Sequence, residues 1–166
     1  MKKIALFFAA ILPMMAMAQE IKIGYVSTQE VMMLMPEIND IEKQMADFNE
    51  KNTKYLQDMQ VEIQNKAKAY DAEKANLSDA IRAAREEDLY SMQERLQTTY
   101  QTLQQEAQAK QQALLKPVQD KLRAAIETVG QKNNFFMIFE SEAGLLYKSP
   151  KAVDATPLIK KELGIL

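Results

Sequence analysis

The 166-residue sequence predicts a mostly α-helical protein in which one long antiparallel helical hairpin, similar to a coiled coil, projects from a small β-sheet body. Residues 37–129 contain no glycine, and their common residues are Gln, Ala, Glu, Lys, Leu and Met, which are strong helix formers. The apolar positions of this segment form two stripes that mirror each other. Short apolar segments that resemble β-strands flank it, at 21–26 and 135–147. A rod with a small base is therefore expected.

The first 18 residues have the pattern of a secretory signal peptide. Two lysines precede an apolar run from Ile4 to Met15, and residues 16–18 form the small-x-small pattern that signal peptidase accepts. The alternative is a membrane anchor, but the run is shorter than the roughly 20 residues of a spanning helix, and no Cys follows it to accept a lipid. We predict export, cleavage between Ala18 and Gln19, and no stable membrane insertion.

The composition argues against catalysis and against nucleic-acid binding. The sequence has no Cys and no His, so it lacks disulfides, the commonest general base and the commonest transition-metal ligand. The acidic run at 86–88 spreads around a helix and fits a solvated face better than a metal site. Loss of Lys2 and Lys3 with the signal peptide leaves 19 basic against 23 acidic side chains, a net charge of −4. We expect no enzymatic activity, no cofactor, no metal and no nucleic-acid partner.

The mature chain begins with a predicted strand and a short helix. Residues 21–26 alternate in polarity as a half-buried strand does. One face of this strand carries Ile21, Ile23 and Tyr25. Ser27 and Glu30 have the spacing of a capping box, so a helix should begin there. Pro36 interrupts that helix, because proline is favoured in a first turn and not in an interior, and a long helix should start near Glu37.

The long helical segment carries two apolar stripes that each repeat about every 3.6 residues. The first comprises Leu34, Ile38, Ile41, Met45, Phe48, the polar Asn52, Tyr55 and Met59. The second comprises Leu89, Met92, Leu96, Tyr100, Leu103, Ala107, Gln111, Leu114, Val118, Leu122, Ala125 and Val129. Reflection of the sequence about Leu77 and Ser78 superimposes the stripes and pairs Ile41 with Leu114. This symmetry predicts an antiparallel hairpin with its turn at 76–79, where Asn, Ser and Asp are typical turn residues.

The predicted arm is long and thinly packed. About 40 residues per helix would reach roughly 60 Å at 1.5 Å per residue. A near-heptad stripe also matches itself after a slip of seven residues, so the hairpin is better determined than its register. Alanines replace larger side chains near the turn, and a hairpin covers each helix on one side only. Pro117 predicts a kink or break in the second helix, and a tolerated kink is favoured over a hinge.

The C-terminal part is predicted to complete the body. Gly130 should end the second helix. Residues 135–140 and 145–147, joined by a turn at 141–144, are predicted to form a β-hairpin beside the N-terminal strand. The apolar run in the first of these strands implies that both of its faces are covered.

Three short strands make a sheet too small to be stable alone, so further copies of the chain are expected to cover it. The residues expected at this contact are Ile21, Ile23, Tyr25, Phe136, Ile138 and Leu146. Thr156 and Pro157 should cap a final helix at 158–163, which Gly164 ends. The predicted division of the chain is a signal peptide at 1–18, a body formed by 19–36 and 130–166, and an arm at 37–129.

Several segments resemble the OmpH/Skp family of periplasmic outer-membrane-protein chaperones. They are IKIGYVS at 21–27, MPEI at 35–38, NLSDAIRAAREEDL at 76–89 and IFESEAGLLYKSPKAVDATPLIKKELG at 138–164. The resemblance covers the whole mature chain. It implies a homotrimer whose strands join into a small β-barrel, with three hairpins around a cavity. Unfolded outer-membrane proteins would be held there, in the periplasm and without ATP.

Two features depart from that family. Its best-known members are strongly basic, whereas this mature chain is acidic. Ala155 stands between Asp154 and Thr156, where the family usually has a branched residue. The first difference bears on any client capture that depends on positive charge.

Soft or amphipathic side chains along the arm suit contact with varied apolar clients. The candidate client contacts are Tyr70, Tyr90, Met32 and Met33. Packing between the two helices is favoured over client contact for Met45, Tyr55, Met59 and Tyr100. The alternative function is a structural coiled-coil spacer or adaptor of the cell envelope that binds no client.

Overall fold

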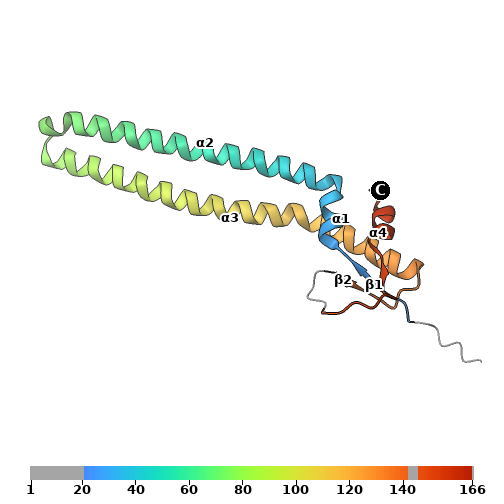
Figure 1. The fold of residues 1–166 in the computed structure, drawn as a ribbon. Coiled ribbons are helices and arrows are strands. Elements are labelled where there is room, and N and C mark those ends of the chain that lie inside the picture. Colours follow the sequence, from blue (N-terminus) through green and yellow to red (C-terminus); the bar gives the residue numbers. More distant parts are fainter. Residues whose placement is uncertain (1–20, 142–145, 166) are drawn as a thin grey trace, which may run out of the picture.

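The computed structural model describes residues 21–141 and 146–165, which form a long rod with a small body at one end (Figure 1). In chain order the elements are β1 (Ile23–Val26), α1 (Thr28–Leu34), α2 (Pro36–Glu73), the 3-10 helix η1 (Lys74–Asn76), α3 (Asp79–Lys132), β2 (Met137–Glu140), β3 (Val153–Asp154) and α4 (Thr156–Leu163). The predicted combination of a long helical hairpin and a small β-sheet is confirmed. The predicted signal peptide, with its cleavage point between Ala18 and Gln19, lies outside the described residues.

The rod consists of α2 and α3, which run antiparallel with the turn between them at Leu77 and Ser78 (Figure 1). Contacts across the hairpin fix its register. Lys66 pairs with Asp88 at 2.8 Å, and the ammonium of Lys110 lies 5.2 Å from the ring centre of Phe48. Each of these pairs lies within about three residues of the predicted register. The mirror symmetry of the apolar stripes therefore predicted the hairpin correctly.

Helix α3 continues without interruption through Pro117. The break that this proline could have caused is absent from the described helix. Proline removes one backbone hydrogen bond, and the neighbouring residues on α3, Val118 and Leu122, are buried against the base of the hairpin. Tertiary packing therefore holds the helix together at this position.

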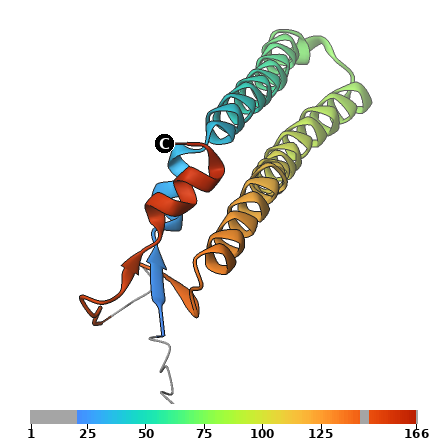
Figure 2. The same ribbon diagram turned by 90° about the vertical axis from the view of Figure 1, so that its right-hand side faces the viewer.

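The short helix α1 begins as the capping box predicts, since the Ser27 side chain accepts a hydrogen bond from the Glu30 backbone at 3.3 Å. The Glu30 carboxylate pairs with Lys160 of α4. The Ser27 backbone N–H donates to the hydroxyl of Thr156 at 3.3 Å. These contacts tie α1 to α4, and Figure 2 shows the two helices side by side above the sheet.

The sheet has β1 in its centre, with β2 and β3 on either side and both parallel to β1. The predicted β-hairpin is therefore wrong. Leu146 and Tyr147 belong to no strand, and the third strand is Val153–Asp154. A parallel neighbour needs a connection that carries the chain back to the start of the sheet, so the connection between β2 and β3 cannot be a tight hairpin. The predicted turn at 141–144 falls mostly outside the described residues.

The second helix ends later than predicted. Helix α3 continues past Gly130 to Lys132, and the chain leaves it at Asn133 and Asn134. Asn134 takes a positive φ of 54°, which asparagine tolerates better than most residues. The Asn133 side chain donates to the Val129 carbonyl at 2.9 Å and so satisfies a terminal carbonyl.

The hydrophobic core sits where the rod meets the body. Its buried residues come from β1, α1, α2, α3 and α4 and their flanks: Val26, Val31, Met35, Ile41, Val118, Leu122, Ala125, Val129, Ala155 and Ile159. Gly24 faces this side of the sheet, and a Cβ there would come within 2.8 Å of the Phe135 ring. Gly164 takes a left-handed conformation and ends α4, as predicted.

Candidate association face and client-contacting arm

The outward face of the sheet is apolar and exposed. Side chains alternate along a strand, so Gly24 and Val26 face the core while Ile23 and Tyr25 face outward. The parallel register places Met137 beside Ile23 and Phe139 beside Tyr25 on the same side. Phe139 is 46% exposed. A small sheet with one apolar face open to solvent is a surface suited to association.

A cavity of about 430 Å³ lies over this face. Its lining includes Ile21, Ile23, Tyr25 and Phe139 from the sheet side and Tyr147 from the loop before β3. From the same loop, the ammonium of Lys148 lies 3.6 Å from the centre of the Tyr25 ring. The loop therefore touches the outward face while leaving most of it open.

The residues predicted to mediate association separate into two groups. Ile21, Ile23 and Tyr25 belong to the outward side, and Phe136 and Leu146 are exposed next to the sheet. Ile138 instead packs against the hydrophobic core of the chain. Sequence reasoning missed the outward positions of Met137 and Phe139, because the apolar run at 135–139 has no alternation. The pairing register with β1 is the signal that separates its two faces.

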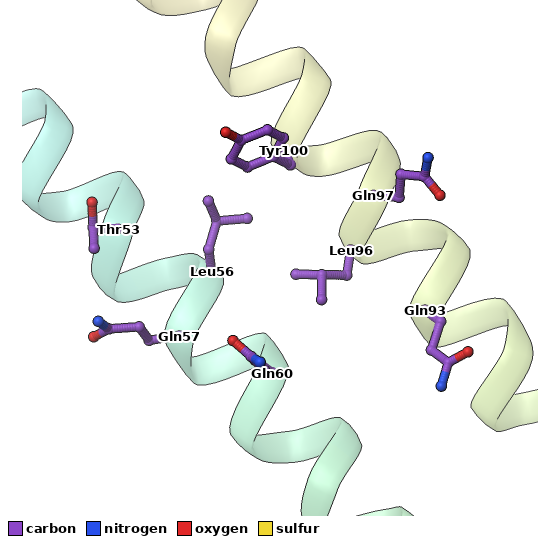
Figure 3. Close-up of a pocket in the computed structure, with 8 residues that line it drawn as sticks. All are labelled: Thr53, Leu56, Gln57, Gln60, Gln93, Leu96, Gln97 and Tyr100. Carbon is purple, nitrogen blue, oxygen red and sulfur yellow. The ribbon is translucent and has the colours of Figure 1, made fainter.

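The seam between α2 and α3 is buried at three positions of the outer arm, namely Met59, Ile63 and Met92. Met59 therefore belongs to the seam, as predicted, and Met45 packs against the core near the base. Tyr55 is 54% exposed, so its assignment to the seam is wrong. Its neighbour Leu56 points toward α3 instead (Figure 3). Tyr100 is also half-exposed, although Figure 3 shows it on the side of α3 that faces α2.

The four candidate client residues differ in accessibility. Tyr90 is 70% exposed on the outer arm, and Met33 is 65% exposed at the base. Met32 packs against the core. The Tyr70 hydroxyl donates a hydrogen bond to the Glu86 carboxylate across the arm, which raises the pKa of the phenol. Tyr90 and Met33 are thus the two candidates whose apolar surface is open.

Polar contacts replace apolar packing near the end of the arm. Lys66 pairs with Asp88 at 2.8 Å, and Arg85 lies 3.9 Å from Glu73 on the other helix. All four side chains are largely exposed, and exposed ion pairs each contribute little to stability. The end of the arm is therefore held less firmly than its base.

At the base of the arm, Glu37 of α2 pairs with Lys121 of α3. The hydrogen bond from Lys121 holds the pKa of the Glu37 carboxyl below its ordinary value. A carboxyl with a lowered native pKa stabilises the fold above its unfolded-state pKa, and that stabilisation is lost as the pH falls through the native pKa. The pair is partly exposed, so its contribution is small.

We expect the Glu37→Gln variant to lose about 0.2–1 kcal/mol of unfolding free energy at pH 7. The difference from the parent should shrink below roughly pH 4, under the ordinary glutamate pKa. Denaturant unfolding at pH 7 and pH 3 measures both values. Asp40→Asn is the matched control, because Asp40 lines the same surface groove between α2 and α3 as Glu37 and Lys121 but makes no ion pair within the described residues. A deficit of Glu37→Gln that persists unchanged at pH 3 would contradict the assignment.

Two features of other functional classes are absent from the part of the chain that the structure describes. No group of three or more acidic side chains there is placed to hold a metal ion. Over the same residues, no helix combines the length and the apolar character needed to cross a membrane.

Comparison with known proteins places the chain in a family. The profile of the family described as "Outer membrane protein (OmpH-like)" matches residues 22–163. The chain belongs to the OmpH-like family. The OmpH-like assignment agrees with the fold, since the structure is similar to the crystal structure of a candidate outer membrane chaperone (OmpH-like) from Caulobacter crescentus CB15. The TM-score is 0.72 at 20% identity, over 85% of this chain and 82% of that chain. A search of curated proteins gives no match.

Proposed function

We propose that this OmpH-like protein is an ATP-independent periplasmic holdase, which binds unfolded outer-membrane β-barrel proteins between the helical arms of a homotrimer and prevents their aggregation. The observation that carries the proposal is the separation of the fold into two parts. All ten residues of the core cluster lie in the body or in the adjoining base of the arm. The rest of the hairpin is a long, thinly packed projection.

The body supplies the association. Its outward sheet face carries Ile23, Tyr25, Met137 and Phe139, and all of these except Met137 line a mostly apolar cavity. A three-stranded sheet with one uncovered apolar face gains stability when other sheets cover it. Three copies, the number that the family resemblance implies, would close such sheets around a shared interior and direct the arms to one side.

The arms supply the client contact. Each helix has one side against its partner helix and the other in solvent, and exposed Tyr90 and Met33 offer apolar surface at the outer arm and at the base. Methionine and tyrosine make contacts with varied shapes at modest entropic cost. A client held by many such contacts remains unfolded and can be released without chemistry.

The test is suppression of aggregation. An outer-membrane β-barrel protein diluted from urea scatters light as it aggregates, and stoichiometric chaperone should abolish most of this scattering in the absence of ATP. A spacer or adaptor that binds no client would leave the scattering unchanged, and that result would refute the holdase function. Native mass spectrometry of the same mixture gives the number of subunits per client.

Client binding should depend little on salt. The mature chain has a net charge of −4, so long-range attraction contributes little and apolar contact dominates. We expect suppression of aggregation to change by less than about twofold as the Debye length falls from roughly 10 Å to 3 Å. A steep loss of binding at high salt would show instead that local basic clusters, such as Lys160 with Lys161, capture the client.

A further inference from the structure

A groove of about 500 Å³ opens between α2 and α3 midway along the arm (Figure 3). Its lining includes two leucines and four glutamines, Leu56, Leu96, Gln57, Gln60, Gln93 and Gln97. The two walls match, because each helix contributes one leucine and two glutamines at helical spacing. Thr53 and Tyr100 lie at the end nearer the body. We call this feature the glutamine groove.

The two helices pack less closely at the groove than they do farther out along the hairpin. Farther out, the seam residues Met59 and Met92 are buried, whereas Leu56 and Leu96 are only half-buried. Figure 3 shows these two leucines pointing toward each other between the helices, with Gln57 and Gln97 on the outer sides. The groove therefore has an apolar floor and polar rims.

The lining carries no charge. Lys54, Asp58, Glu94 and Arg95 occur in the same stretches of α2 and α3, yet none of them lines the groove. The four glutamine side chains form no hydrogen bond within the described residues, although Gln131 elsewhere on α3 does. A glutamine amide can both donate and accept. The rims thus offer unused donors and acceptors on either side of an apolar floor.

We propose that the glutamine groove binds an uncharged, extended segment of an unfolded polypeptide. One apolar side chain of the segment would rest on Leu56 and Leu96, and its backbone amides would pair with the glutamines on the rims. The inference rests on the holdase function proposed above and names the kind of client segment that the arm selects. A charged side chain would be excluded, because the lining has no partner for it and an unpaired charge is costly to desolvate.

A strand of a β-barrel protein has the required chemistry. Its successive side chains point to opposite faces, so alternate apolar residues can enter the groove while the others stay in solvent. In the unfolded state its backbone amides have no partners within the chain. The volume of the groove lies within the range of roughly 300–1,000 Å³ found for ligand-binding clefts, which is ample for one large side chain.

The experiment uses the full mature protein and a capped nine-residue peptide of alternating Thr and Val with one central Trp. The protein contains no Trp, so indole fluorescence reports only on the peptide. Binding should shift the emission to shorter wavelength and saturate. The double variant Gln57→Glu with Gln97→Glu should weaken binding at least tenfold, because it places two carboxylates on the rims while glutamate preserves helix propensity.

The matched control is Gln64→Glu with Gln104→Glu, which adds the same charge to exposed positions of the same two helices outside the groove lining. It should change the affinity less than twofold. A peptide with two Val replaced by Lys, which places the charges on the side that enters the groove, should bind at least tenfold more weakly, although the net negative chain attracts it at long range. Weaker binding of the cationic peptide therefore identifies an uncharged site.

The proposal is overturned if the neutral peptide does not bind, if the lining and control variants have equal effects, or if the Lys peptide binds as well as the neutral one. The proposal is also overturned if the lining variant sediments differently from the parent when no peptide is present, since the groove would then be a contact between copies of the chain. Light scattering separates the two proposals: if the parent protein suppresses aggregation but does not bind the neutral peptide, only the groove assignment is removed.

Discussion

Removal of the outer arm should abolish client holding while leaving the body intact. In this variant Lys54 is joined to Gln101 through a short glycine-rich turn, which deletes residues 55–100 and shortens the hairpin by about 34 Å at 1.5 Å per residue. The deletion removes three buried apolar side chains, Met59, Ile63 and Met92, but none of the ten residues of the core cluster. The shortened protein should therefore remain helical and keep the oligomeric state of the parent.

Suppression of aggregation should fall at least tenfold, because a shallow cavity cannot enclose a client. Light scattering at increasing chaperone concentration measures this loss, and sedimentation with circular dichroism verifies the body. A smaller deletion provides the control: removal of 67–73 and 82–88 preserves the turn and the register, shortens the arm by roughly 10 Å, and should retain most of the activity. If the variant that lacks residues 55–100 still suppresses aggregation fully, the arms are not the client-holding part. If this variant is an unfolded monomer, the body does not fold independently of the outer arm.

The Phe139→Asp substitution should dissociate the oligomer without unfolding the subunit. Phe139 lies on the outward face beside Tyr25, and in the proposed assembly a carboxylate there would have to be desolvated among apolar side chains. Such a charge costs about 3–5 kcal/mol, which corresponds to weakening of the association by roughly 100-fold to 1,000-fold or more. Analytical ultracentrifugation should show monomers at concentrations where the parent is an oligomer, with the helical content unchanged.

Two further substitutions make this test specific. Ile138→Asp places the same charge on the inner face, where Ile138 packs against the core, and should lower the stability of the subunit itself. Tyr90→Asp places it on the exposed outer arm and should alter neither property. If Phe139→Asp sediments like the parent, or if the parent is itself monomeric, the outward face is not the association surface.

The helical hairpin could be predicted from the sequence because its signals are local and repeated. Helix propensity, the two stripes and the polar turn all indicate the same structure. A single misassigned position in a stripe therefore does not change the prediction of a hairpin. The exact seam could not be predicted as well. Tyr55 and Leu56 both lie three or four residues from Asn52 and from Met59, so the helical spacing allowed either one at this turn. The structure leaves Tyr55 54% exposed and points Leu56 toward α3.

The sheet was harder to predict because its pairing is non-local. The apolar run at 135–139 gives no alternation from which its faces could be read. A glycine and polar residues at 141–144 suggested a tight turn, whereas the structure has both neighbouring strands parallel to β1. The inner position of Ile138 and the outward positions of Met137 and Phe139 follow only from that register. Pairing between residues more than a hundred positions apart in the sequence, such as Ile23 with Met137, therefore determines which side chains face outward.

The central position of β1 has a consequence for the order in which the chain folds. This strand is the first described element, and both of its partner strands follow the hairpin, with Ile23 paired to Met137. Closing a disordered loop of that length costs about 4 kcal/mol or more in chain entropy. The helices form through local contacts that need no such closure, and their zipping brings the two ends of the hairpin together. We therefore expect the helical hairpin to form before the sheet and to bring the strands of the body together.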